Sequence, residues 1–330
     1  MTKIEAARQE YADWCSAIGI DSIDKLNAAL ADGGAVELIN LCEARQERKY
    51  AQAADQIFYR RKKVRIVMMS GPSSSGKTSS SLRIAQQLKV LGMNPKVLEL
   101  DNYFVNREFT PVDENGEKDY EALEAMDVKF LNEQLNDLLD GKEIDVPKFD
   151  FVAGCRTFTG AKMKLEPSDV LCMEGIHALN PDLTPSVDQS KIFRIYISAL
   201  SALPGGEKVH NSTTDKRLLR RIVRDNRTRG ISPEDNILRW PSVRRGETRN
   251  IFPFEENADI VFNSSTLYDI PLLKYYAEPL LFGISEASPA YEKAHSLLNF
   301  LDHVTALKPS EIAAIPPTSI MREFIGGQRL

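Results

Sequence analysis

The stretch from Ile66 to Leu88, IVMMSGPSSSGKTSSSLRIAQQL, constrains this chain more than any other part of its sequence. A short apolar run leads into a loop that fits the pattern G-x-x-x-x-G-K-[ST], and a helical pattern that ends near Gly92 follows it. The alternative is a Ser/Gly-rich linker, but a linker requires neither a strand before it nor a helix after it. The context therefore predicts a phosphate-binding loop, or P-loop.

The chemistry of such a loop gives a role to each of its residue types. Small residues allow backbone N–H groups to turn inward as an anion-binding nest, and the positive end of the following helix adds to the attraction. Lys77 is suited to neutralise the β- and γ-phosphates, and the Thr78 hydroxyl is suited to bind Mg²⁺. We expect ATP to be bound, with Mg²⁺ as cofactor, by Gly71, Ser73, Ser74, Ser75, Gly76, Lys77, Thr78 and Ser79.

The bulk composition excludes several classes of protein. A net charge of −5 disfavours nucleic acid as a partner, and the apolar runs are too short to span a membrane. The N-terminal residues carry early acids and no apolar segment of the kind found in signal peptides. The four cysteines are scattered without C-x-x-C spacing, which indicates reduced thiols, a cytoplasmic location and no cysteine-based metal site.

Short apolar runs rich in Val and Ile alternate with helical patterns after residue 63, which is typical of an α/β fold with a mainly parallel sheet. We predict a P-loop NTPase-type three-layer fold. A small antiparallel hairpin is expected within Ile144–Leu165, around Gly154 and Gly160. The five predicted sheet strands are Val64–Met69, Lys96–Leu100, Asp169–Met173, Lys191–Ile197 and Ala258–Phe262.

Helical patterns lie on both sides of this α/β region. Ser22 is expected to cap a helix that stops at Gly33-Gly34, and a second helix runs from Ala35 to about Arg61. The predicted divisions are a helical N-terminal extension over 1–62, a P-loop domain over 63–282 with an arginine-rich lid at about 216–250, and a helical C-terminal extension over 283–330.

Acids at two predicted strand ends indicate which of the reactions served by P-loops this chain performs. Ligands of an open parallel sheet bind at the carboxyl ends of its strands, where Asp101 and Glu174 are both expected beside the P-loop. Glu174 is suited to hold Mg²⁺, and Asp101 to accept a proton from an attacking hydroxyl. The alternatives are a turn cap for Asp101 and a surface acid for Glu174. A guanine-reading N-K-x-D motif is absent, and His177 is interpreted as structural.

Five short motifs occur in an order that resembles the uridine kinase and phosphoribulokinase family of P-loop kinases: SGPSSSGKTS, LDNYF, VPKFDFVAGCR, MEGIHALN and DKRLLRRIVRDNRTRG. The resemblance covers about residues 65–264. The outer parts, including the ending PPTSIMREFIGGQRL, are similar to a subgroup of bacterial nucleoside kinases.

The resemblance implies specific site residues. Asp101 would be the catalytic base, Tyr103 and Phe104 would border the acceptor site, and Arg156 would reach the acceptor. The arginines of a mobile lid would correspond to Arg221, Arg224 and Arg229, with Arg224 and Arg229 acting in catalysis together with Lys77, and with Arg221 near the acceptor.

The charge of the lid segment supports an anion-binding role. Between Lys216 and Arg249 eleven basic residues face four acidic ones, a local excess of seven positive charges in an acidic protein. The alternative is a solvated helix face with i,i+4 ion pairs. Arg217, Arg220, Arg221 and Arg224 are spaced to share one face without enough acids to pair them, which favours ATP phosphates as their partner.

Two departures from the family pattern concern the acceptor. Ala122 stands where uridine kinases commonly carry a histidine that reads the uracil edge, and Ile231 stands where a lid arginine is usual. We expect a kinase that acts on a small-molecule hydroxyl, foremost the 5′-hydroxyl of a nucleoside. A phosphorylated pentose or other sugar alcohol, and an ATP-binding regulatory or RNA-associated protein, remain as alternatives. A homo-oligomer and GTP as donor both stay open.

Overall fold

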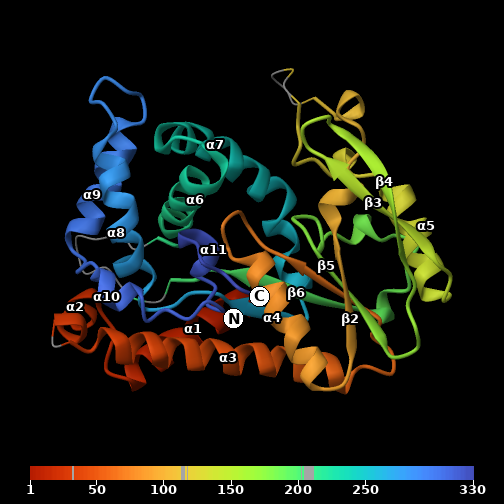
Figure 1. Cartoon of the computed structure of the whole chain (residues 1–330), viewed down its shortest axis with the longest axis horizontal. Helices are drawn as coiled ribbons and strands as arrows, with labels where there is room; N and C mark the ends of the chain where they lie inside the picture. The colour runs from red at the N-terminus through yellow and green to blue at the C-terminus, as the bar shows by residue number, and fades with distance from the viewer. Residues whose placement is uncertain (32, 113–115, 117, 202, 204–211) are drawn as a thin grey trace.

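The computed structural model describes residues 1–31, 33–112, 116, 118–201, 203 and 212–330. Its centre is a sheet of five parallel strands in the order β2-β5-β1-β6-β7 (Figure 1). The strands are β1 (Ile66–Ser70), β2 (Asn94–Glu99), β5 (Asp169–Glu174), β6 (Ile192–Ser198) and β7 (Ile260–Asn263). The five predicted strands and the α/β class are confirmed, with boundaries that differ by about two residues.

The remaining elements are helices, short 3-10 turns and one hairpin. The α-helices are α1 (Lys3–Ala17), α2 (Ile23–Ala31), α3 (Ala35–Tyr59), α4 (Lys77–Val90), α5 (Val128–Leu139), α6 (Thr213–Arg229), α7 (Pro233–Asn250), α8 (Asp269–Phe282), α9 (Tyr291–Asp302), α10 (Pro309–Ile312) and α11 (Arg322–Ile325). The 3-10 turns are η1 (Leu100–Tyr103), η2 (Arg107–Phe109), η3 (Leu123–Ala125), η4 (Pro181–Leu183), η5 (Gln189–Lys191) and η6 (Phe252–Asn257).

The sheet is covered on both faces, which produces the predicted three layers. Alternate residues of β1 point to opposite sides, as the pleat requires. Ile66 and Met68 join the core formed with α5, whereas Val67 and Met69 join the core formed with α3 and α4. Because both faces are buried, the strand sequence is continuously apolar rather than alternating.

The predicted hairpin is also present. Strands β3 (Ile144–Asp150) and β4 (Cys155–Met163) pair antiparallel and lie beside α5, at one end of the molecule (Figure 1). Gly154 and Gly160 both have positive φ, +71° and +82°, a backbone conformation that glycine adopts without steric cost. The hairpin lies next to η1, where the acceptor residues were expected.

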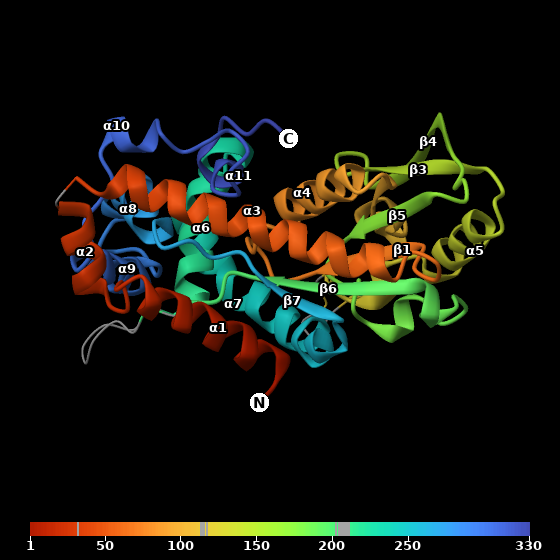
Figure 2. The same cartoon turned by 90° about the horizontal axis from the view of Figure 1, so that it is seen from below.

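The N- and C-terminal helices share one core. Tyr11 and Leu38 from the N-terminal helices belong to the same buried cluster as Leu218 of α6, Leu297 of α9 and Met321 beside α11. Figure 2 shows α3 running along the molecule with α1 and α2 beside it. The C-terminal helices α8, α9 and α10 lie at the end of the molecule where α2 lies. No helix in the described ranges is long and apolar enough to cross a membrane.

The basic lid segment forms the antiparallel pair α6 and α7, and its pairing differs from the sequence expectation. Arg217 is buried and forms an ion pair with Glu247 (2.6 Å), and buried Arg220 forms one with Asp269 (2.6 Å). These arginines hold the fold together, and neither a phosphate nor solvent is their partner. The expectation that too few acids are available to pair these arginines is wrong for these two, because Glu247 on α7 and Asp269 on α8 are their partners.

We predict that Asp269→Ala lowers the free energy of unfolding by about 3–5 kcal/mol, because the charge of Arg220 is then left buried without a partner. Asp269 also accepts hydrogen bonds from Arg220 and Thr266, both at 2.6 Å. Urea denaturation measures the change. The control is Asp21→Ala, which breaks an exposed ion pair with Lys25 and should cost less than about 1 kcal/mol. Equal losses in the two variants would contradict a structural role for the buried pair.

Candidate active site

The register of the sheet brings three predicted site segments to one edge. Glu174 at the end of β5 pairs with Met69 of β1 on one side and with Glu99 of β2 on the other. Gly71 and Asp101 each follow two residues after these partners, so the P-loop and both acids meet at the carboxyl edge. The site was predicted at this edge, and the alignment of the three strand ends explains why the residues converge.

Backbone geometry, rather than composition alone, shapes the P-loop. A Cβ atom on Gly71 would lie 2.0 Å from the carbonyl oxygen of Ile197, a backbone atom that cannot move aside. Gly76 caps α4 with a φ of +82°, and Ser74 has a φ of +57°. Left-handed residues within a turn allow successive N–H groups to face one concavity, which is the geometry of an anion nest.

Hydroxyl groups of the loop are available for a ligand. Among the described residues, the buried Ser74 and Ser75 hydroxyls have no hydrogen-bond partner. Buried polar groups are nearly always partnered, so these two hydroxyls indicate that the loop is completed by something polar. The Nζ atom of Lys77 donates a hydrogen bond to the carbonyl of Pro72 in its own loop at 3.3 Å.

Thr78 and Glu174 provide oxygen atoms that fit Mg²⁺. The Thr78 hydroxyl donates to Oε1 of Glu174 at 2.9 Å, so the two groups already face each other. Burial raises the pKa of Glu174, while the charge of Lys77 and the Thr78 hydrogen bond lower it. No cluster of three or more His, Cys, Asp or Glu side chains suited to a metal lies within the described residues. An ion held here would take its other ligands from phosphate and water, as Mg²⁺ commonly does.

Asp101 lies in η1, directly after β2, on the P-loop side of the sheet edge. Its side chain reaches solvent, yet the surrounding protein removes enough hydration to raise its pKa, and the charge of Lys77 opposes that rise. Arg229, at the end of α6, also lowers this pKa. The charges of Lys77 and Arg229 favour the ionised form of this carboxylate, which is the form that can accept a proton.

The three lid arginines surround one buried carboxylate, Asp225. Arg224 is 2.7 Å from it, Arg221 is 3.4 Å and Arg229 is 3.6 Å. Arg221 also donates to the hydroxyl of Ser73 at 2.9 Å and so contacts the P-loop directly. Arg229 keeps 55% of its side chain exposed, which leaves it the freest of the three to approach a ligand.

The residues expected at the acceptor are divided between the buried core and partly exposed positions. Tyr103 is completely buried and its hydroxyl donates to Gln134 at 2.7 Å, so its ring offers no face to a ligand. Phe104 keeps partial exposure. Arg156 donates to the carbonyl of Phe104 at 3.3 Å and to Asp127 at 2.7 Å, which fixes its guanidinium beside Phe104. Of the two aromatic residues, only Phe104 remains a candidate for the acceptor site.

Two residues near the site were not identified from sequence, and a third was identified and interpreted as structural. Glu247 accepts a hydrogen bond from the backbone N–H of Ser73 at 2.9 Å. Glu121 lies against Gly246 of α7, where an added Cβ would meet its Oε2 atom at 2.2 Å. His177, which was interpreted as structural, is buried against the backbone of Ala122, and burial lowers its pKa to about 4. Glu247 and Glu121 lie outside the five motifs, so only the tertiary arrangement places them near the site.

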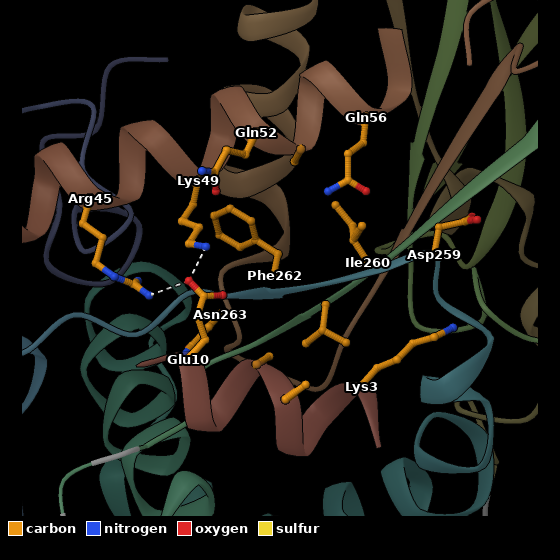
Figure 3. Close-up of a pocket in the computed structure, with 14 residues that line it drawn as sticks. Lys3, Glu10, Arg45, Lys49, Gln52, Gln56, Asp259, Ile260, Phe262 and Asn263 are labelled. Carbon is orange, nitrogen blue, oxygen red and sulfur yellow. Dashed lines mark ion pairs between the residues drawn. The ribbon is translucent and has the colours of Figure 1, made fainter. Parts of the chain in front are cut away.

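A separate cavity of about 350 Å³ lies between α1, α3 and β7 (Figure 3). None of its lining residues belongs to the P-loop. Its cations are already partnered: Glu10 forms ion pairs with Arg45 and Lys49, and Lys3 donates to the carbonyl of Ala258 at 2.6 Å. Because little uncompensated charge remains, the cavity does not compete with the P-loop as the site of phosphate chemistry.

A P-loop at the carboxyl edge of a parallel sheet, with acids at two neighbouring strand ends and arginines beside it, defines a nucleotide-binding P-loop kinase. The model of the phosphoribulokinase / uridine kinase family matches residues 66–271, and the chain belongs to this family. The resemblance drawn from the sequence motifs is thereby confirmed.

Two curated relatives agree with this assignment, and one solved structure is reported with them for its likeness alone. The uridine kinase of Macrococcus caseolyticus (strain JCSC5402) is 32% identical over 201 residues, covering 60% of this chain and 87% of that protein. The uridine kinase of Staphylococcus aureus (strain JH9) is 31% identical over 198 residues, covering 59% and 86%. The solved structure of a "possible uridine kinase" from Bacillus stearothermophilus is 19% identical with a TM-score of 0.43, covering 67% of this chain and 100% of that chain.

We predict a pH dependence of stability that originates at Glu121. Burial, reinforced by the negative charge of Glu247, raises the pKa of Glu121 to about 7, whereas the unfolded chain loses this proton near pH ~4.3. Between these values the folded state binds more protons, so the Glu121 contribution to the free energy of unfolding falls as pH rises.

Glu121→Gln should remove this part of the slope. Urea denaturation at intervals from pH 5 to pH 8 measures it, with exposed Glu133→Gln on α5 as the control. A slope that stays the same as in the wild type would show that Glu121 ionises normally.

Proposed function

We propose that this protein transfers the γ-phosphate of ATP, with Mg²⁺, to the hydroxyl of a small molecule, foremost the 5′-hydroxyl of a nucleoside. The observation that carries the proposal is the meeting of Lys77, Asp101 and the Thr78–Glu174 pair at one sheet edge. Each of the three is suited to a different requirement of phosphoryl transfer: charge neutralisation, proton acceptance and metal binding.

In this proposal the loop N–H groups and Lys77 bind the phosphates and orient the γ-phosphate toward Asp101. Thr78 and Glu174 would hold Mg²⁺, which when bound would supply charge neutralisation at the phosphate oxygens. Asp101 accepts the proton of the attacking hydroxyl. Arg224 and Arg229 neutralise charge that develops during transfer, and Arg221 positions the loop through Ser73. Catalysis is then mainly positioning and electrostatic stabilisation.

The acceptor side supports a nucleoside with broad base selectivity. Phe104 offers an aromatic surface and Arg156 is fixed beside it, but Ala122 cannot donate a hydrogen bond to a base. Stacking on an aromatic face discriminates weakly, whereas sharp selectivity requires polar groups that a wrong ligand leaves unpaired. We therefore propose that ribose is recognised better than the base. A phosphorylated pentose or other sugar alcohol is the second candidate acceptor.

A different class of function, an ATP-binding regulatory or RNA-associated protein with slow hydrolysis, is the main rival. Asp101 argues against it, because a protein that only binds nucleotide requires no base at the end of β2. ADP release measured with and without a panel of acceptors separates the two. Release that no acceptor accelerates would favour the rival.

We predict that Asp101→Asn lowers kcat by about two to four orders of magnitude, the range for losing a general base. ATP affinity should change little, since Asp101 faces the acceptor. Lys77→Ala serves as the comparison, because it should abolish transfer by weakening the hold on phosphate while the fold persists. Steady-state kinetics and nucleotide titration measure both. Lost ATP binding with normal turnover at saturation would reassign Asp101 to the nucleotide.

We predict phosphorylation of more than one nucleoside. A turnover panel of uridine, cytidine, adenosine, guanosine, inosine, thymidine and ribulose 5-phosphate tests this, with coupled detection of ADP. Strict use of uridine would mean that another residue replaces the histidine absent at Ala122. Activity on ribulose 5-phosphate alone would overturn the nucleoside proposal and leave the kinase.

A further inference from the structure

The C-terminal segment, residues 319–330, lies across the beginning of the P-loop helix. Figures 1 and 2 both place α11 beside α6 and close to α4. This segment lies beyond the part of the chain that the family model matches, which ends at residue 271. It nevertheless contacts the phosphate-binding loop directly.

The contact is made by a carboxylate. Oε2 of Glu323 accepts hydrogen bonds from the backbone N–H of Ser79 at 3.3 Å and from the Ser79 hydroxyl at 2.5 Å. Gln328 donates to the same hydroxyl at 2.6 Å. Ser79 is the third residue of α4, so its N–H has no partner within the helix and points toward the loop side.

The backbone of the segment is anchored. Met321 and Phe324 are completely buried, and the guanidinium of Arg220 lies 4.9 Å from the Phe324 ring centre. Arg227 donates to the carbonyls of Phe324 and Glu323 at 3.3 and 3.4 Å. The side chain of Ile320 fills the space beside Gly76, where an added Cβ would lie 2.3 Å from it. Release of Ser79 therefore requires a rotation of the Glu323 side chain and no movement of the anchored backbone.

The position of Ser79 identifies what the carboxylate replaces. Lys77 and Thr78 serve the β- and γ-phosphates and their metal, so the next N–H along the chain, that of Ser79, is left for the α-phosphate. A carboxylate and a phosphate oxygen cannot accept the same N–H, and two anions at this distance repel each other.

We propose that Glu323 is a built-in competitor for the α-phosphate and thereby sets the affinity for nucleotide. The carboxylate satisfies Ser79 in the free protein, and a nucleotide binds only when it displaces that side chain. The competition acts on the phosphates and not on the nucleoside part of the ligand. This inference rests on the proposed function in one respect, that the P-loop binds nucleotide, and it is independent of the acceptor.

Isothermal titration of the full chain with ADP and with adenosine tests the proposal. Glu323→Gln keeps the shape and an acceptor oxygen but removes the charge, so we expect ADP to bind about tenfold more tightly and adenosine binding to stay unchanged. The matched control is Glu286→Gln, an exposed residue after α8 whose hydrogen-bond partner is Tyr291, which should leave both affinities unchanged. Thermal melting confirms that each variant is folded.

A second variant separates charge from packing. Gln328→Ala removes one hydrogen bond to Ser79 without changing charge, and the Kd for ADP should change by less than about twofold. A gain as large as that of Glu323→Gln would assign the effect to loosening of the segment and overturn the proposal.

The remaining outcomes are also decisive. If the wild type binds ADP and Glu323→Gln binds it equally or more weakly, this inference is overturned and the proposed function is left intact. If neither the wild type nor Glu323→Gln binds ADP, both this inference and the proposed function are overturned. If only Glu323→Gln binds ADP, the competition is confirmed in its strongest form.

Discussion

The shared register of β2, β5 and β1 is the constraint on which the site depends. Glu174 ends β5, which lies between β2 and β1. The residues after β2 lead to Asp101 in η1, and those after β1 lead into the P-loop. A slip of one residue in any of these strands would turn its side chains to the opposite face and separate the acids from the loop. The continuous apolar cover on both faces holds this register, because every strand residue that slips must leave one core for the other.

Local signals explain what the sequence could predict. The five strands, the hairpin and the helix after the P-loop follow from short apolar runs, glycines and a motif with its flanking elements, all of which lie within a few residues of one another. Asp101 and Glu174 were found because each directly follows a strand, and parallel strands end at one edge. The divisions at residues 62 and 282 remain predictions, although helices from both extensions share one core.

Distant partners explain what the sequence could not predict. Arg217 and Arg220 carry the same signal as the other lid arginines, and their carboxylate partners lie 30 and 49 residues further along the chain. The ring of Tyr103 belongs to a motif, yet its burial is decided by α5. Glu323 approaches Ser79 across 244 residues, and no periodicity or spacing records such a contact.

The buried Arg217–Glu247 pair limits how the arginine-rich segment can close. Glu247 of α7 forms an ion pair with Arg217 of α6 and accepts a hydrogen bond from the N–H of Ser73 in the P-loop. Both helices are therefore linked to the loop at this end of the pair. Moving the whole helical pair away would break the hydrogen bond from Ser73 to Glu247 and the buried ion pair between Arg220 and Asp269 of α8. The tip around Gly230, which caps α6 with a φ of +64°, lies at the opposite end of the helical pair from Glu247. The end of the segment that carries Glu247 is therefore fixed to the P-loop, and we expect any closure over a bound nucleotide to involve the opposite end, which carries Arg229, rather than the whole helical pair.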